Sequence, residues 1–170
     1  MFLEIIYFLL PAAFANMMPV FVKKIPLLHF PLDAGLTFRK KRLLGENKTV
    51  RGLLFAVLAS LSVVLLQSFF SYGIIDYSLH SPFLVGLLIG IGVILGDALG
   101  SFIKRQFAIA PGESLYVLDQ IDSVLVFPLL LSFVVWIGFR YYLLSIILWG
   151  VFHLILKYFG FILGIEEKKI

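Results

Sequence analysis

The sequence predicts an all-α, polytopic membrane protein with five transmembrane helices, and three observations lead to this prediction. Of its 170 residues, 61% are hydrophobic and only 14% are charged, and the mean hydropathy is +1.06. A soluble domain of this size could not bury so many apolar side chains. The apolar residues form five runs that approach the roughly 20 residues needed to cross a bilayer, too many for a signal peptide. We place the spans near residues 2–22, 52–72, 82–102, 124–139 and 141–164, within one domain that covers residues 1–170.

The positions of the basic residues predict how these spans are oriented. Cytoplasmic loops of membrane proteins carry an excess of Lys and Arg. The loop 23–51 holds eight of the 14 basic residues. The loop 103–123 begins with a Lys-Arg pair, whereas the loop around Asp76 has no basic residue. We therefore expect a multi-pass protein of the cell membrane, with both basic loops and the C-terminus in the cytoplasm and the N-terminus outside.

Proline, glycine and two polar residues predict local features of the spans. Pro11 and Pro19 each lack a backbone N–H donor, so we expect them to kink or break the first helix. In the fifth span, we interpret His153 as a helix-packing residue and Lys157 as a side chain that snorkels to the cytoplasmic interface; the alternative is that both belong to the functional site. Glycines spaced four apart in the third span allow close helix packing in lipid. They are Gly86, Gly90, Gly92, Gly96 and Gly100.

Asp97 is an acidic residue inside the apolar third span. An ionised group near the bilayer core must be paired, protonated or bound to a metal. On a helix, Asp97, Ser101 and Lys104 fall at i, i+4 and i+7 and so share one stripe that extends to the cytoplasmic surface. Arg105 is the next residue round the helix. This stripe makes a functional role for Asp97 the favoured interpretation.

A second acidic pair precedes the fourth span. Asp119 and Asp122 are three residues apart and therefore lie on one helix face. If the third and fourth helices pack side by side, these carboxylates can meet Asp97. Hard oxygen ligands suit magnesium, which commonly takes one or two carboxylates and leaves positions for water and phosphate. We interpret the three aspartates as magnesium ligands and the Lys104-Arg105 pair as phosphate-binding cations; the alternatives are a helix cap and a positive-inside anchor.

The end of the loop 23–51 predicts a second phosphate-binding element. It reads Gly45-Glu-Asn47-Lys48-Thr49-Val-Arg51-Gly52 and leads directly into the second span. A helix N-terminus presents free backbone N–H groups and the positive end of a dipole, which bind phosphate. Lys48, Thr49 and Arg51 add charge and a hydroxyl there. The pattern is not a Walker A loop, because Gly-x-x-x-x-Gly-Lys-Ser/Thr is absent.

Three other compositional features are less specific. The basic block Arg39-Lys40-Lys41-Arg42 can attract anionic headgroups, at about 1 kcal/mol per charge, or contact a substrate, and both interpretations stay open. Asp33 and Gly35 lie in a proline-flanked turn, and turn formation accounts for them. The chain has no cysteine, which excludes disulfides and thiolate metal sites.

These motifs together resemble a known enzyme superfamily. Gly96-Asp97, Ser101-Phe-Ile-Lys104-Arg105 and Leu118-Asp119-Gln120-Ile-Asp122 are similar to the cytidylyltransferase motif of the CDP-diacylglycerol synthases. Lys48-Thr49-x-Arg51-Gly52 is similar to the second block of that superfamily, although Val50 replaces a common aromatic residue. The Asp-Gln-Ile-Asp form and the five spans look most like the archaeal branch, the CDP-archaeol synthases. Longer bacterial and eukaryotic members usually carry a His-Gly-Gly triplet, where this chain has Ala110-Pro111-Gly112-Glu113.

The resemblance implies a CTP-dependent nucleotidyltransferase. Its partners would be CTP, an isoprenoid glycerol-phosphate lipid (2,3-bis-(O-geranylgeranyl)-sn-glycerol 1-phosphate) and the bilayer, its cofactor magnesium, and its products CDP-archaeol in unsaturated form and pyrophosphate. No protein nucleophile is needed, so catalysis would rest on positioning and charge neutralisation. The catalytic residues would be Asp97, Asp119, Asp122 and Lys104, the three aspartates also binding the metal. The substrate contacts would come from Lys48, Thr49, Arg51, Asn47, Ser101 and Arg105.

Other functions are open from the sequence alone. A CDP-diacylglycerol synthase acting on ester-linked phosphatidic acid would use the same residues. A small cation-coupled transporter would use Asp97 to bind its cation, although five spans without inverted halves argue against it. A CDP-alcohol phosphotransferase needs an Asp-Gly-x-x-Ala-Arg context that is absent, and a non-catalytic adaptor would leave both polar clusters unexplained. We expect no nucleic-acid partner.

Overall fold

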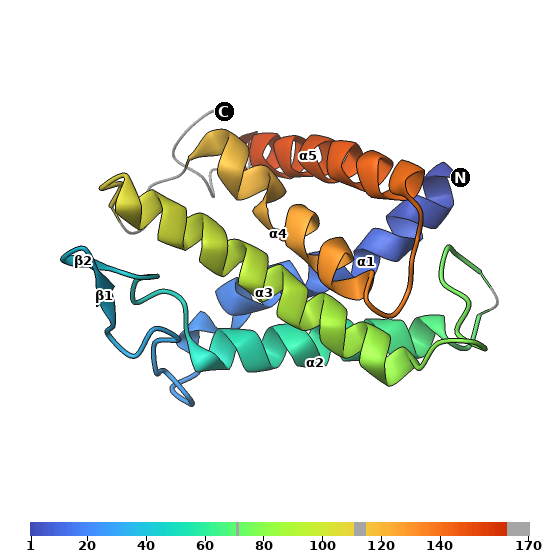
Figure 1. Ribbon diagram of the computed structural model, residues 1–170, viewed down its shortest axis with the longest axis horizontal. Helices are drawn as coiled ribbons and strands as arrows, with labels where there is room; N and C mark the ends of the chain where they lie inside the picture. Colours follow the sequence, from blue (N-terminus) through green and yellow to red (C-terminus); the bar gives the residue numbers. More distant parts are fainter. Residues whose placement is uncertain (71, 111–114, 163–170) are drawn as a thin grey trace.

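The computed structural model of the protein describes residues 1–70, 72–110 and 115–162. Its helices are α1 (Phe2–Phe21), η1 (Val22–Lys24, a 3₁₀ turn), α2 (Val50–Gln67), α3 (Pro82–Gln106), α4 (Tyr116–Leu131) and α5 (Phe139–Ile162). Two short antiparallel strands, β1 (Thr37–Phe38) and β2 (Lys41–Arg42), form a hairpin between α1 and α2 (Figure 1). The side chains of His153 and Lys157 lie outside the described part, as do residues 111–114 and the residues after Ile162.

Three of the described helical segments are long and apolar enough to cross a membrane: Phe2–Lys24, Val50–Gln67 and Pro82–Gln106. Two further apolar stretches, Ile121–Leu131 and Phe139–Phe152, are shorter. The helical class and the membrane character predicted from composition are therefore confirmed. The number of five spans and the orientation of the termini stay predictions.

The first helix is continuous through both of its prolines. α1 includes Pro11 and Pro19, so the predicted possibility of a break is wrong. A transmembrane helix tolerates proline where neighbouring segments pack around the freed carbonyl. Pro11 is fully buried, and a Cβ on Gly52 of α2 would lie 3.4 Å from Pro19 Cβ, so both prolines have close neighbours.

The helices extend differently from the predicted spans. α3 continues to Gln106 instead of ending at residue 102, and α4 begins at Tyr116 and ends at Leu131 instead of covering 124–139. Hydropathy locates the apolar stretch, whereas backbone hydrogen bonding continues into the charged turns on either side. The Lys104-Arg105 pair and both aspartates of the second motif consequently lie on helices, where their spacing fixes their faces. After α4 the chain turns at Gly138, whose φ of +85° is left-handed, and α5 starts at Phe139.

α3 packs against two neighbours through glycines on two of its faces. A Cβ on Gly86 would lie 2.9 Å from Leu61 Cα, and a Cβ on Gly90 would lie 2.7 Å from Val57 Cα; both neighbours are on α2. A Cβ on Gly92 would lie 2.5 Å from Phe127 Cα on α4. Real Cβ atoms do not approach backbone atoms so closely, so these helices are in backbone contact. The packing interpretation of the glycines is confirmed.

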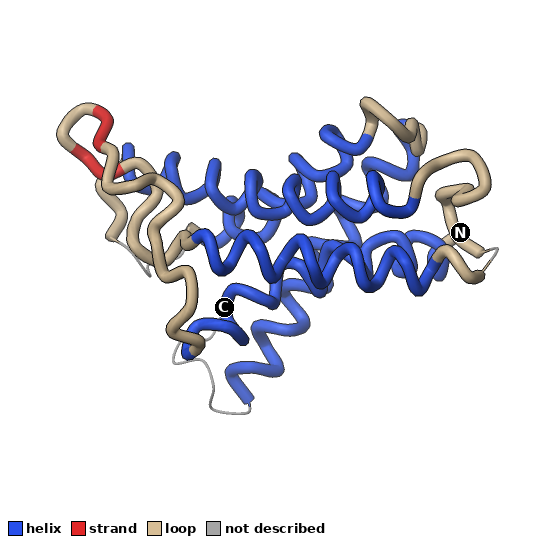
Figure 2. Tube along the Cα trace, turned by 90° about the horizontal axis from the view of Figure 1, so that it is seen from below, coloured by secondary structure: helices blue, strands red, loops and turns tan. Residues whose placement is uncertain are grey.

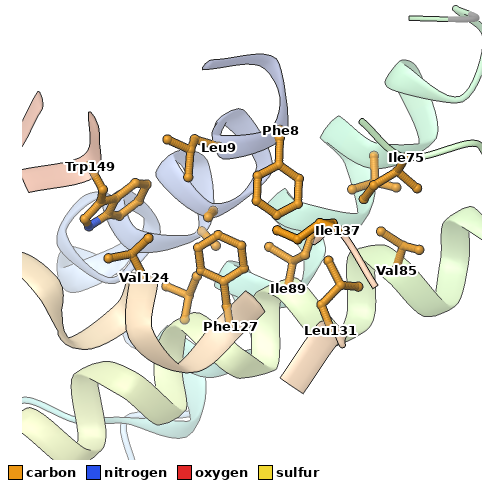
Figure 3. Close-up of a cluster of buried hydrophobic side chains, with 14 of the residues drawn as sticks. Phe8, Leu9, Ile75, Val85, Ile89, Val124, Phe127, Leu131, Ile137 and Trp149 are labelled. Carbon is orange, nitrogen blue, oxygen red and sulfur yellow. The ribbon is translucent and has the colours of Figure 1, made fainter. Parts of the chain in front are cut away.

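The apolar core lies where α1, α3, α4 and α5 meet. Phe127 of α4 is fully buried, with its ring centroid 5.7 Å from that of Phe8 and 6.4 Å from that of Trp149. Ile89 and Leu131 fill the adjoining space (Figure 3). The hairpin lies at one end of the bundle, beside the end of α3 (Figure 2).

Candidate active site

The start of α2 is fixed by a cap and by an antiparallel bridge. Thr49 is the N-cap of α2, and its Oγ1 accepts a hydrogen bond of 3.2 Å from Gly52 N. Thr49 also forms a bridge with Pro31, and Val50 N donates to Phe30 O at 2.9 Å. The side chain before the cap, Lys48, is thereby held at the first turn of a helix, where the dipole favours anions. Thr49 therefore acts at this site through the backbone that it caps.

Lys48 and Asp97 form an ion pair between α2 and α3. Lys48 Nζ lies 2.5 Å from Asp97 Oδ2, and the two side chains are 23% and 28% exposed. The acid in the apolar helix therefore has a cationic partner 49 residues earlier in the chain. This pairing joins the two sequence motifs that were expected to bind phosphate.

A second ion pair joins the end of α3 to the start of α4. Lys104 Nζ lies 2.7 Å from Asp119 Oδ1, with only 14% of the lysine side chain exposed. Arg105, the next residue, is 8% exposed, and its Nε and Nη1 have no hydrogen-bond partner among the described residues. Ser101, one turn earlier, is also buried. Buried guanidinium nitrogens without a partner are costly, which makes Arg105 a candidate anion-binding group.

Asp122 lies against the glycine face of α3. A Cβ on Gly100 would lie 2.5 Å from Asp122 Oδ2, and one on Gly96 would lie 2.5 Å from the Asp122 carbonyl oxygen. The following residue, Ser123, is within hydrogen-bond distance of Val93 O on α3, at 3.2 Å. The third and fourth helices therefore do pack side by side, and their close contact extends from Phe127 to the acidic motif.

The three aspartates are near one another, but their carboxylates are not arranged around one position that a metal ion could occupy. The charges of Asp97 and Asp119 both act on Asp122. In the described part of the chain, no three His, Cys, Asp or Glu side chains are grouped so that they could hold a metal ion. Asp97 and Asp119 instead each contact a lysine. Their carboxylate chemistry fits magnesium, and binding one ion together would require both lysines to move to other partners.

Arg51 and Asn47 occupy different settings at the start of α2. Arg51 is 3% exposed, and its Nη1 donates to Ile25 O in the segment that follows η1. Its backbone N donates to Leu28 O at 3.0 Å, so Arg51 fastens this segment to α2. Asn47 is exposed beside Lys48. Their expected substrate contacts stay predictions.

Asp33 is a buried residue whose importance the sequence interpretation missed. Turn formation is confirmed, because Gly35 N donates to Asp33 Oδ1 at 3.0 Å. Leu44 N and Gly45 N also donate to Oδ2, at 3.0 and 3.1 Å, and Arg42 Nε lies 3.3 Å from the same oxygen. Burial opposes ionisation of Asp33, but these bonds outweigh it and lower the pKa to about 2. The hydrogen bonds to the ionised Asp33 carboxylate therefore stabilise the fold fully above about pH 4, and this stabilisation is lost as the pH falls through about 2.

The hairpin is fastened to the end of α3. Lys41 Nζ donates to Gln106 O at 2.5 Å, and the Phe38 and Phe102 rings are 6.1 Å apart. Arg39 and Lys40 form its two-residue turn with φ of 51° and 61°. Such a turn favours Asn-Gly, so two exposed basic residues here are unusual.

Comparison with known proteins identifies the family of this chain. A family model described as CarS-like, CDP-archaeol synthase, matches residues 1–169. The chain belongs to the CDP-archaeol synthase family. The CDP-archaeol synthase of Staphylothermus marinus is 34% identical over 167 residues, which cover 96% of this chain and 89% of that protein. The one from Pyrococcus furiosus is 38% identical over 120 residues, covering 69% of this chain and 68% of its own length.

Another relative and a solved structure extend the comparison. The CDP-archaeol synthase of Thermofilum pendens is 40% identical over 120 residues, which are 68% of this chain and 54% of that protein, so the match spans about half the length of that relative. A solved structure described as "Structural insight into an intramembrane enzyme for archaeal membrane lipids biosynthesis" is similar with a TM-score of 0.73 and 30% identity. The match covers 89% of this chain and 91% of the chain in the solved structure. Membership of the CDP-archaeol synthase family confirms the resemblance inferred from the motifs.

Proposed function

We propose that this chain transfers CMP from CTP to an isoprenoid glycerol-phosphate lipid and so produces CDP-archaeol and pyrophosphate. One observation carries the proposal: the starts of α2 and α4 and the end of α3 bring two lysine–aspartate pairs, a third aspartate and a buried arginine to one end of the bundle. Membership of the CDP-archaeol synthase family supports this assignment. The positive-inside pattern of the sequence supports a cytoplasmic position for this end, where CTP is available.

The reaction needs no protein nucleophile. An oxygen of the lipid phosphate attacks the α-phosphorus of CTP, and the bond from that phosphorus to the bridging β-oxygen breaks as pyrophosphate leaves. The required groups are cations that hold two polyanions together in the correct geometry. Lys48, at the start of α2, and Lys104 and Arg105, at the end of α3, are these cations, and the amides capped by Thr49 add a dipole.

The aspartates are assigned to magnesium. Asp97, Asp119 and Asp122 would hold the ion, which supplies charge neutralisation at the phosphates. When substrate phosphates attract Lys48 and Lys104, Asp97 and Asp119 lose their cationic partners and become free to bind the ion. The ion pairs therefore keep these carboxylates neutralised before substrates enter.

The proposal is tested by pyrophosphate release from purified protein with CTP, magnesium and a lipid acceptor. The acceptors are the bis-geranylgeranyl ether phosphate and an ester-linked phosphatidic acid, and we expect faster release with the ether lipid. Asp122→Asn should lower kcat/KM at least ~100-fold, whereas Asp76→Asn, an exposed acid of the loop 68–81, should not change it. Absence of release with every acceptor would overturn the proposal, and full activity of Asp122→Asn at limiting magnesium would overturn the metal assignment.

A further inference from the structure

Asp33 has a buried carboxylate that the proposed reaction does not use. Its side chain is 0% exposed, and it accepts hydrogen bonds from three backbone amides and from Arg42. Two of these amides belong to Leu44 and Gly45, which are consecutive and point to the same oxygen. A turn alone needs only the bond to Gly35. The remaining bonds join Asp33 to the segment that enters α2.

These bonds close a ring that contains Lys48. Asp33 Oδ2 holds Gly45 N at 3.1 Å, and Gly45 O accepts a hydrogen bond of 3.3 Å from Lys48 N. Lys48 O in turn accepts a bond of 2.7 Å from Leu32 N, and Leu32 directly precedes Asp33 in the chain. Both backbone polar groups of Lys48 are therefore fixed by segments that Asp33 holds together. The side chain of Lys48 leaves this ring to meet Asp97.

We propose that Asp33 is a positioning residue that holds Lys48 in place to bind phosphate. The inference rests on the proposed function, because it assigns to Asp33 the placement of a residue of that site. Carboxylate is the suitable group here, since it accepts several N–H bonds at once and pairs with Arg42. An Asn at this position has only one acceptor oxygen. Whichever way its amide is turned, the N–H₂ group faces N–H donors, either those of Leu44 and Gly45 or those of Gly35 and Arg42, so bonds that hold the ring together are lost.

The test compares Asp33→Asn, Lys48→Met and the double variant by steady-state kinetics with CTP and the lipid acceptor. We expect Asp33→Asn to raise the KM of one substrate about 10- to 100-fold, and to raise it for the same substrate that Lys48→Met affects. In the Lys48→Met background, Asp33→Asn should raise KM by a much smaller factor, because the lysine through which Asp33 acts is already absent. Glu46→Gln is the matched control: Glu46 also pairs with Arg42, at 2.8 Å, but it is exposed and has no part in the ring.

Two outcomes overturn the inference. One is that Asp33→Asn raises KM by the same factor whether Lys48 is present or replaced by Met. The other is that Asp33→Asn raises the KM of a different substrate from the one that Lys48→Met affects. If Asp33→Asn does not fold, Arg42→Met removes the ion pair and leaves the backbone bonds, and it should show the same pattern at smaller size.

A measurement without substrate separates this inference from the proposed function. Hydrogen exchange should become faster at Gly45 and Lys48 in Asp33→Asn and stay unchanged in α5. If the wild type releases no pyrophosphate, the proposed function fails, but exchange still tests whether Asp33 holds the segment of Lys48. Unchanged exchange at both amides would overturn the positioning role.

Discussion

The two ends of the helix bundle both contain buried polar groups, and they differ in how these groups are satisfied. At the far end, near the N-terminus and the loop 68–81, Gln67 is 4% exposed; its Nε2 donates to Tyr7 O at 2.6 Å and its Oε1 accepts from Tyr77 Oη at 3.1 Å. Burial, with a smaller effect from Tyr7, raises the pKa of Tyr77 to about 12, so this hydroxyl stays a donor. All of these groups are neutral and bonded to one another.

The opposite end, which carries the candidate active site, contains buried charges instead. Arg51 and Arg105 are almost fully buried, and guanidinium nitrogens of both have no hydrogen-bond partner in the described ranges. A protein that needed only to fasten its helices could do so with neutral groups, as the far end does. Buried cations that are partly unsatisfied are instead typical of a site prepared for an anionic ligand. The buried polar groups of the far end are thus neutral and satisfied, whereas those of the other end are charged and partly unsatisfied, which supports the proposed anion-binding site there.

The largest expected effect comes from removing a charge at the active-site end. Asp97→Asn should lower kcat/KM at least ~100-fold while the helices still assemble, because the loss is of electrostatic positioning. Steady-state assays with CTP, together with circular dichroism, check both parts. Ser78→Ala, which removes the exposed partner of Asp76 at the far end, is the control and should leave kcat/KM unchanged. Equal losses in the two variants would contradict the division between the ends.

A smaller effect is expected from separating α3 and α4. Gly96→Ala would place a Cβ 2.5 Å from the Asp122 carbonyl oxygen and 2.6 Å from Ser123 Cα, so α4 must shift at a cost of about 1–3 kcal/mol in stability. We expect a lower thermal midpoint and reduced activity together. The matched control is Gly150→Ala in α5, where a Cβ meets nothing within 4 Å and where helix propensity predicts a gain of about 0.5–1 kcal/mol. A neutral Gly96→Ala would show that the backbone contact can relax.

The far end should show the reverse pattern. Gln67→Leu leaves the Tyr7 carbonyl and the Tyr77 hydroxyl without a partner and should cost about 1–3 kcal/mol in the free energy of unfolding. At temperatures where the variant is folded, its kcat and KM should match the wild type. Denaturation in detergent and kinetics on the same preparation measure the two quantities. A selective loss of kcat would mean that the far end takes part in the reaction.

The smallest effect is expected at the turn of the hairpin. Replacing Arg39-Lys40 by Asn-Gly relieves two left-handed residues, which should stabilise the hairpin by about 1 kcal/mol per residue. The same change removes two cations, each worth about 1 kcal/mol at an anionic surface. Activity in vesicles should therefore depend less on their content of anionic lipid. Replacing Arg39-Lys40 by Gln-Gln removes the same charges without improving the turn geometry, and it should reduce this dependence equally. Dependence equal to that of the wild type would contradict contact with headgroups.

Much of the candidate active site follows from local spacing. The stripe of Asp97, Ser101 and Lys104 and the face shared by Asp119 and Asp122 need only the helical period, and α3 and α4 provide it. The ion pair of Lys48 with Asp97 does not follow from spacing, because no local rule joins residues so far apart. The ring around Asp33 could not be predicted, since it depends on bonds from Asp33 to amides 11 and 12 residues later. A carboxylate next to a proline and a glycine is explained equally well by a simple turn.

The helix boundaries show a second limit of sequence analysis. The predicted fourth span, 124–139, follows the apolar residues, whereas α4 begins at Tyr116 because a helix continues wherever its backbone bonds can form. Hydropathy contains no information about that continuation. The hairpin was missed for a related reason: its turn consists of Arg39 and Lys40, residues that do not usually occupy left-handed positions.

The glycines of α3 have a consequence for how this sequence can vary. Lipid-facing positions such as Leu95 and Leu99 need only an apolar side chain, and many residues would serve there. At Gly90, Gly92 and Gly96, in contrast, the neighbouring backbone occupies the place of a Cβ, and every other amino acid has one. We expect substitutions to accumulate on the outer surface of α3 and to be rejected on the faces that touch α2 and α4. The distance between Lys48 at the start of α2 and the two aspartates of α4 is thus set by the diameter of the α3 backbone, because no side chain of α3 separates it from either neighbour at these glycines.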